Sequence, residues 1–291
     1  DSKYNPKISI VNLGVYACTG PYLDYFRRFT SKKVNIYWKS SYTPDEIVIS
    51  DTVAQLLSKS KNWKKAKKVP LSLESKKKVI DYIEKRLDHQ SVDTSVYFKS
   101  KMLLKDIKGL SQFFEESYVT YCAFPNVVWD GHEEDRNILF DSVTDWMVSL
   151  INLFFNSNDK SLIIRFHPSE STLYTRSVKL EEILKDRCGS KLKSKNIFLI
   201  SSDKIIDSYE LIKKIDCSLV YDSFIGLESI YLNKPTIFAS EGAVPGQYIN
   251  SKKFENSKEY VNFINKGKIF KVDKSCFNES KERVLKFIDW Y

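Results

Sequence analysis

The stretch SLIIRFHPSE at residues 161–170 carries three side chains that could take part in chemistry, namely Arg165, His167 and Glu170. A guanidinium, an imidazole and a carboxyl group placed this close together can bind an anion and move a proton. The apolar run before them is typical of a buried strand, and Pro168 favours an extended backbone at His167. Since ligands bind at the carboxyl ends of the strands in open α/β sheets, the stretch predicts a ligand site.

A second stretch, YDSFIGLES at residues 221–229, has the composition of a phosphate cradle. The hydroxyl of Ser223 and the flexible backbone at Gly226 would lie at the start of a helix, where backbone N–H groups attract an anion. Glu228 would then lie in the first helical turn, within reach of a ribose or, as in a capping box, of the N–H groups of the helix itself. The chain contains neither a P-loop motif nor a GxGxxG motif.

Polar residues also follow a third apolar run, which begins near residue 118. Asn126, Trp129 and Asp130 come after it, and the carboxyl ends of parallel strands meet at one rim of a sheet. We therefore predict that the catalytic candidates are His167, Glu170 and Asp130. The residues predicted to bind the ligand, a nucleotide or other phosphate compound, follow these same three runs and are Arg165, His167, Ser223, Gly226, Glu228, Trp129, Asn126 and Asp222.

The first 117 residues predict an incomplete α/β portion followed by a helical connector. Two strands are too few for a complete doubly wound domain, and the chain does not begin with Met, so a fragment of a longer protein is expected. Residue periodicity places strands at residues 7–12 and from Val34, helices at residues 21–29, 51–60 and 73–87, and a helical or irregular connector at residues 90–114.

Residues 118–291 alternate between strand-like and helix-like runs. This alternation predicts a doubly wound parallel sheet with helices on both faces, as in a Rossmann-like α/β domain. The expected strands cover residues 118–124, 162–166, 196–200, 217–221 and 235–240, and the expected helices cover residues 138–155, 178–184, 208–214, about 226–232, 257–265 and 279–290.

Cysteine and histidine usage predicts neither a disulfide framework nor a metal site. The five cysteines are odd in number and scattered, as is typical of reduced thiols in a cytoplasmic protein. The three histidines are dispersed, and no Asp-x-Asp pair is present to clamp a metal-bound diphosphate. We therefore expect no metal and no cofactor. No apolar run approaches the roughly 20 residues that span a bilayer, so we expect a cytoplasmic location.

The formal net charge is +9, and much of the excess lies between Lys59 and Lys78. Such a run is typical of a solvated helical face, and it could also contact anionic lipid headgroups, nucleic acid or a charged polysaccharide. The chain carries no recognisable nucleic-acid-binding module, so we expect no nucleic-acid partner. Peripheral contact with the inner face of the cytoplasmic membrane through this segment stays open as an alternative to simple solvation.

The motifs FPNVVWDG, LIIRFHPSE and SLVYDSFIGLESIYLNKPTIFA occur in the same order as in the capsule and surface polysaccharide biosynthesis glycosyltransferases, and the chain resembles this family over residues 118–239. The resemblance implies a GT-B-like fold, with an acceptor-side domain in residues 1–117 and a nucleotide-sugar-binding domain in residues 118–291. It also implies metal-independent transfer from a nucleotide-sugar donor to a glycan or lipid-linked glycan acceptor. In relatives that use CMP-activated sugars, the His-Pro histidine and a Ser/Thr pair contact the donor phosphate. His167 and Ser223 match those positions, which favours a CMP-sugar, whereas Asp222 stands where a hydroxyl residue is common.

Two alternatives accompany this interpretation. The segments VYDSF and NKPTIF are also similar to teichoic-acid glycerophosphotransferases, which implies a CDP-glycerol type of donor. The incomplete N-terminal portion and Asp222 are also compatible with a degenerate glycosyltransferase domain that binds a glycan or a partner enzyme without catalysis. In the enzymatic interpretation, His167 and the helix start at Ser223 would stabilise the leaving nucleotide phosphate.

Overall fold

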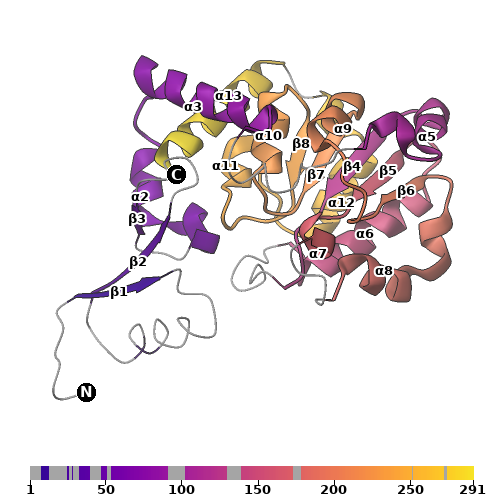
Figure 1. The fold of residues 1–291 in the computed structure, drawn as a ribbon, viewed down its shortest axis with the longest axis horizontal. Coiled ribbons are helices and arrows are strands. Elements are labelled where there is room, and N and C mark those ends of the chain that lie inside the picture. The colour runs from indigo at the N-terminus through magenta and orange to yellow at the C-terminus, as the bar shows by residue number, and fades with distance from the viewer. Residues whose placement is uncertain are drawn as a thin grey trace.

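Five parallel strands form the central sheet of the computed structural model (Figure 1). The structure describes residues 8–12, 25, 28, 33–39, 47–50, 54–90, 102–129, 139–172, 178–250, 252–271 and 274–291. When the five strands of this sheet are numbered in chain order, their spatial order is 3-2-1-4-5, as in a Rossmann sheet. The predicted α/β fold with a Rossmann-like parallel sheet is therefore confirmed. In spatial order, the strands are β6 (Ile197–Ile200), β5 (Ser161–Arg165), β4 (Thr120–Phe124), β7 (Cys217–Val220) and β8 (Thr236–Phe238).

The strands read as continuous apolar runs because helices cover both faces of the sheet. Along β4, Tyr121 and Ala123 belong to the core on one face, while Cys122 and Phe124 belong to the core on the other. Helices α6 (Val143–Phe155), α8 (Leu180–Cys188) and α12 (Ser257–Asn265) contribute to the first core. The second core is formed by α2 (Lys61–Ala66), α3 (Leu73–Leu87), α5 (Leu110–Glu116), α9 (Ser208–Lys214), α10 (Ile225–Tyr231), α11 (Gly246–Asn250) and α13 (Lys274–Trp290).

Several helices start directly after a capping residue, and hydrophobic periodicity alone predicted these starts poorly. The helix expected from residue 138 begins at Val143, because the Ser142 side chain accepts the N–H group of Asp145 at 3.0 Å. In the segment expected to form one helix at residues 51–60, the described part is the 3-10 helix η1 (Ala54–Lys59). The Ser60 hydroxyl then accepts the N–H group of Asn62 at 3.1 Å and starts α2 as a separate helix.

The N-terminal sheet contains one strand more than predicted. Besides the two expected strands, the apolar run IVIS forms a third, which pairs antiparallel with its neighbour. Of the helix expected at residues 21–29, only Tyr25 and Arg28 are described, and both are helical. These strands, which lie to one side of the central sheet in Figure 1, are β1 (Ile8–Asn12), β2 (Lys33–Lys39) and β3 (Ile47–Ser50).

The helical segment before the central sheet shares a hydrophobic core with that sheet. Trp63 of α2, Val79 of α3 and Phe113 of α5 belong to the same buried cluster as Phe124 and Val220 of the strands. The predicted boundary after residue 117 falls within this shared core, so the division into two domains stays a prediction. Within the described residues, no helix is both long and apolar enough to cross a membrane.

Two glycines hold the ring of Phe238 in β8 between α10 and α11. A Cβ atom added at Gly226 would lie 2.5 Å from two ring atoms of Phe238, and one added at Gly246 would also contact that ring too closely. Because Phe238 is buried, its ring has little room to move. We expect Gly226→Ala to lower the free energy of unfolding by about 1–3 kcal/mol, measured by urea denaturation. A change of less than about 0.5 kcal/mol, as is usual for a surface substitution, would contradict this packing role.

Candidate functional site

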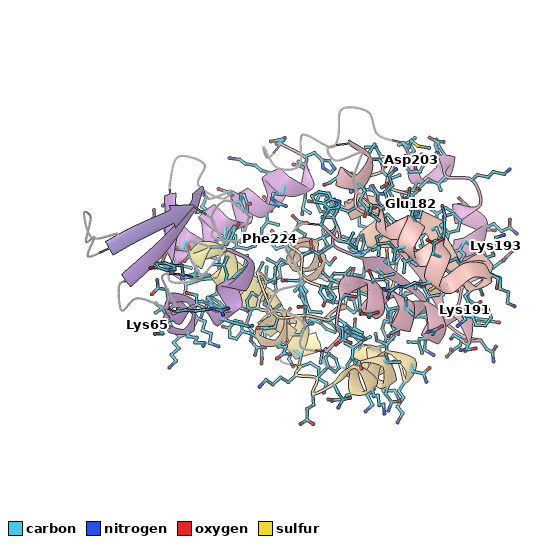
Figure 2. The ribbon with its side chains drawn as sticks, turned by 90° about the horizontal axis from the view of Figure 1, so that it is seen from below. Lys65, Glu182, Lys191, Lys193, Asp203 and Phe224 are labelled. Atoms are coloured by element: carbon cyan, nitrogen blue, oxygen red, sulfur yellow. The ribbon has the colours of Figure 1, made fainter. Side chains whose placement is uncertain are left out.

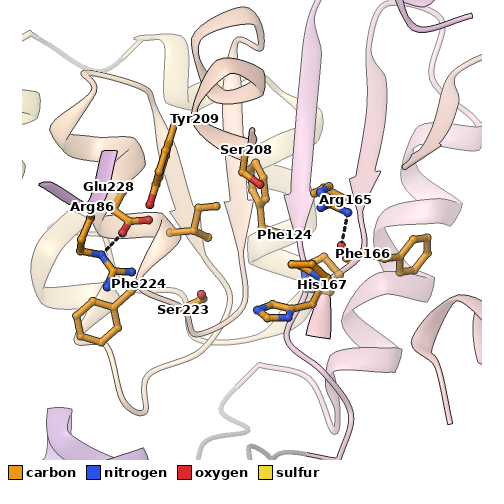
Figure 3. A pocket seen from close by; sticks show the side chains of 13 residues that line it. Arg86, Phe124, Arg165, Phe166, His167, Ser208, Tyr209, Ser223, Phe224 and Glu228 are labelled. Atoms are coloured by element: carbon orange, nitrogen blue, oxygen red, sulfur yellow. Dashed lines mark hydrogen bonds and ion pairs between the residues drawn. The ribbon is translucent and has the colours of Figure 1, made fainter. Parts of the chain in front are cut away.

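A pocket of about 160 Å³ lies at the carboxyl ends of β4 and β5, beside the paired strands β4 and β7, where the winding of the sheet changes direction. Ligands of open α/β sheets bind in this crevice. Segments that are far apart in the sequence build its walls (Figure 3). They are the end of α3 at Arg86, the ends of β4 and β5 at Phe124 and Arg165, the His167–Pro168 pair, the start of α9 at Ser208 and Tyr209, and Ser223, Phe224, Ile225 and Glu228 at the start of α10.

Arg165 places a buried positive charge in the pocket wall. Its Nη1 atom donates hydrogen bonds to the carbonyl oxygens of Phe166 at 2.7 Å and Ser201 at 3.2 Å. Its buried Nε has no hydrogen-bond partner among the described residues. Burial lowers the pKa of Arg165 to about 10, so the guanidinium still carries its charge at neutral pH. An anion in the pocket would offset the cost of burying this charge.

The imidazole of His167 is fixed in one tautomer by the residue that follows Pro168. The backbone N–H group of Ser169 donates to Nδ1 of His167 at 3.2 Å, and the Ser169 hydroxyl lies 2.7 Å from the same atom. Because Nδ1 accepts a hydrogen bond, the proton of the neutral ring resides on Nε2. Figure 3 shows the ring turned toward the side of the pocket where Ser223 lies. A ligand bound on that side of the pocket would lie next to the imidazole.

The start of α10 supplies a hydroxyl to the pocket but only part of the predicted cradle. Ser223 lines the pocket, and its hydroxyl has no hydrogen-bond partner in the part of the chain that the structure describes. The N–H group of Gly226 instead donates to the carbonyl of Ser223 at 3.1 Å. Gly226 faces Phe238 rather than the pocket, so its lack of a side chain serves helix packing.

Glu228 lines the pocket as half of a buried ion pair. Its Oε1 accepts from Nε of Arg86 at 2.5 Å, and both side chains are almost fully buried. Burial acts to lower the pKa of Arg86, but the charge of Glu228 outweighs it and raises that pKa. For Tyr209, burial together with the Glu228 carboxylate, to which its side chain is hydrogen-bonded, raises the pKa of the phenol. The Arg86 guanidinium also lies over the ring of Phe224, with its carbon 5.9 Å from the ring centroid.

The end of α3 is attached to α9 by a second pair. Nε2 of His89 lies 2.8 Å from Oδ2 of Asp207, and the other oxygen of Asp207 accepts the N–H group of Tyr209 at 2.9 Å. The His89 ring stacks on Tyr209 with centroids 5.3 Å apart. The side chains of this pair and the Arg86–Glu228 pair together position Tyr209 at the pocket wall.

Asn126 and Asp222 lie next to the pocket, where they hold the backbone. The Asn126 amide donates to the carbonyl of Asp222 at 2.9 Å and accepts its N–H group at 3.2 Å. The carboxylate of Asp222 accepts the N–H groups of Ala243 at 2.9 Å and Val244 at 2.8 Å. Neither residue lines the pocket. The acidic residue at position 222 therefore anchors the loop after β8, and a direct contact with a donor stays a prediction.

The predicted catalytic carboxyl groups do not reach the pocket lining in the described part of the chain. Glu170, in the short helix α7 (Ser169–Thr172), is buried, and its Oε1 accepts the N–H group of Leu180 at the start of α8 at 3.0 Å. Burial also raises the pKa of Glu170. Trp129 is half-buried and does not line the pocket, while Asp130 lies outside the described residues. Among the described residues, no group of three or more histidine, cysteine or acidic side chains is placed to hold a metal ion.

The loop after β8 carries a carboxyl group that titrates near neutral pH. Burial raises the pKa of Glu241 from 4.5 to about 7, although its Oε2 accepts the N–H group of Gln247 at 2.7 Å. Because the folded-state pKa is the higher one, the stabilisation is complete below the unfolded pKa and is lost as the pH rises through the folded pKa. Relative to Glu241→Gln, we expect the native chain to lose about 1–3 kcal/mol of unfolding free energy between pH 5 and pH 8 in urea titrations. Parallel pH profiles for the two proteins would contradict this.

Sequence reasoning found four of the residues that line the pocket and missed others. Those found are Arg165, His167, Ser223 and Glu228. Arg86 was hidden because it is one of several basic residues on an amphipathic helix. Tyr209 and Phe224 were hidden because an aromatic residue at a helix start is usually part of the core.

The sheet order defines a Rossmann-like α/β protein, and its pocket lies at the carboxyl ends of the strands. No protein-family model matches the chain, and no curated protein sequence matches it either. A solved structure that is similar to it is Thermosulfurimonas dismutans KpsC, beta Kdo 2,7 transferase. The two chains are 14% identical with a TM-score of 0.49, and the match covers 83% of this chain and 67% of the other.

Proposed function

We propose that this protein is a metal-independent glycosyltransferase of bacterial capsule or surface polysaccharide biosynthesis, with a GT-B-like fold. It would transfer a sugar from a nucleotide-activated donor, with a CMP-sugar favoured, to a glycan or lipid-linked glycan. The observation that carries the proposal is the anion-binding character of the pocket. Arg165 contributes a buried charge, His167 an Nε2–H donor and Ser223 a hydroxyl, all at the strand ends where nucleotides bind in such sheets.

The reaction needs a group that stabilises the leaving phosphate. When the bond between the sugar carbon and the phosphate oxygen breaks, its electron pair stays on that oxygen, and negative charge grows there. Hydrogen-bond donors already aimed at the oxygen lower the barrier because they need not reorient. His167 and Ser223 would donate to the phosphate, while the charge of Arg165 would add a longer-range attraction through the pocket wall. The neutral tautomer of His167 already provides the donor, so no prior protonation is required.

The size of the pocket limits what it can enclose. A volume of about 160 Å³ is smaller than the roughly 300–1,000 Å³ of pockets that enclose a drug-sized ligand. We therefore place the phosphate and its immediate neighbours inside, with the rest of the donor extending beyond the pocket. The ring of Phe224, next to the Arg86 guanidinium, offers an apolar face to a ribose or base at the edge.

A thermal-shift panel of CMP, CDP, UDP and GDP tests the proposal. We expect CMP to raise the melting temperature most, because His167 and Ser223 match residues that contact the donor phosphate in enzymes that use CMP-sugars. A ligand at about 100 times its dissociation constant stabilises the fold by roughly 2.7 kcal/mol. His167→Ala should reduce this response, while Lys193→Ala, a change of an exposed side chain, should keep it.

The other outcomes distinguish the alternatives. A dominant response to CDP, with turnover of CDP-glycerol, would favour a glycerophosphotransferase. No response to any nucleotide would contradict the proposal and favour a non-catalytic module that binds a glycan or a partner.

A further inference from the structure

Almost the whole net charge of the protein lies in one short segment. Residues 59–78 contain nine lysines and one acidic residue, Glu74. The rest of the chain has 37 basic and 36 acidic residues, so it is close to neutral. A charge gathered in this way creates a local positive field rather than a general one, and it attracts an extended anionic surface.

The structure presents this charge on a supported turn between α2 and α3. Lys64, Lys65 and Lys68 are exposed, and none of them forms an ion pair with another described residue. Trp63, on the opposite side of α2, is buried, with its ring centroid 5.2 Å from that of Phe287 in α13. The packing of Trp63 holds α2 against the core, so the lysines point outward. Figure 2 shows Lys65 at the end of the molecule far from Lys193.

Two exposed aliphatic side chains follow these lysines in the sequence. Val69 is 61% exposed and Leu73 is 89% exposed, on either side of Pro70. An exposed aliphatic side chain costs free energy in water and gains nothing from a phosphate backbone of nucleic acid or from an acidic glycan. At a lipid bilayer, such side chains enter the boundary between headgroups and acyl chains, while lysines bind the headgroups.

We infer that Lys64, Lys65, Lys68, Val69 and Leu73, here called the lysine turn, form a docking surface for a bilayer of anionic phospholipid. The lysines lie at the headgroup phosphates, and the two aliphatic side chains enter the boundary beneath them. Helix α3 starts in the lysine turn at Leu73 and ends next to the pocket at Arg86, roughly 20 Å away along the helix. Docking does not depend on the proposed transfer reaction, so the two can fail separately.

Vesicle co-sedimentation tests the surface with the full chain. We expect binding to vesicles of phosphatidylcholine with 30 mol% phosphatidylglycerol and weak binding to pure phosphatidylcholine. Binding to the anionic vesicles should weaken as the salt concentration is raised, because salt screens the attraction between exposed charges. Lys64→Gln, Lys65→Gln and Lys68→Gln together should weaken partitioning roughly 100-fold, since each lysine near an anionic surface contributes about a factor of five.

Matched variants separate a membrane from other anions. The triple change Lys193→Gln, Lys195→Gln and Lys258→Gln removes the same charge from exposed lysines elsewhere and should change partitioning less than threefold. Val69→Ser with Leu73→Ser keeps the charge and should weaken vesicle binding about tenfold, while leaving any binding to heparin or duplex DNA unchanged. Equal effects of the two lysine triples, or full vesicle binding by the Val69/Leu73 variant, would overturn the inference. Unchanged circular dichroism and melting temperature in all variants exclude misfolding as the cause.

Discussion

His167→Ala is expected to lower the turnover number of sugar transfer by about 100- to 1,000-fold, the usual cost of losing one donor to a developing negative charge. The imidazole holds its proton on Nε2 because Nδ1 accepts the N–H group of Ser169 at 3.2 Å. Alanine removes that hydrogen-bond donor, and β5 ends before this position, at Arg165. The measurement is the steady-state rate with the sugar donor of whichever nucleotide gives the largest thermal shift. The turnover number should fall more than the Michaelis constant rises, because the hydrogen bond from His167 acts mainly on the leaving group.

A graded series tests whether the tautomer matters. Ser169→Ala removes the hydroxyl that lies 2.7 Å from Nδ1 but keeps the backbone N–H group, so we expect only a loss of about two- to fivefold. His167→Gln retains an N–H donor and should lie between the native protein and the alanine variant. Unchanged transfer and donor hydrolysis in His167→Ala would show that the reaction centre lies elsewhere.

The fold was predictable because the strands are buried on both faces. The runs LIIRF and CSLVY predicted the ends of β5 and β7 to within one residue. The helices expected between the strands required a parallel sheet. Helix starts were less predictable, since they depend on single capping side chains such as Ser60 and Ser142. The N-terminal sheet gained β3, a run of only four residues that is too short for periodicity to resolve.

The site was only half predictable for a different reason. Arg165 and His167 were predicted to line the site because they lie at the end of a strand, and Ser223 because it lies near a helix start. The same reasoning could not distinguish Asp222, whose carboxylate binds N–H groups about 20 residues later in the chain, from a carboxylate that binds a ligand. Arg86 lies 142 residues from the Glu228 that it pairs with, and no local pattern links them.

The second large effect concerns the stability of the Arg86–Glu228 pair. We expect Arg86→Met to lower the free energy of unfolding by about 3–5 kcal/mol, because it keeps much of the side-chain volume but leaves the buried Glu228 carboxylate without its partner. Burial of an unpaired charge costs more than the net stabilisation that the pair itself provides. Urea denaturation at pH 7, with the slope checked for constancy, measures the change. Lys213→Met, which breaks the exposed pair with Glu210, is the control and should cost less than about 1 kcal/mol.

The double variant Arg86→Met with Glu228→Leu separates the structural role of the pair from a role in ligand binding. With both charges replaced by apolar groups, most of the stability should return, because no buried charge is left unpaired. If that stable protein no longer responds to any nucleotide in the thermal-shift panel, Glu228 or Arg86 contacts the donor as well as stabilising the wall. A full nucleotide response would instead assign the pair to the attachment of α3 alone and leave recognition to Arg165, His167 and Ser223. A double variant as unstable as Arg86→Met would contradict the ion pair as the cause of the loss.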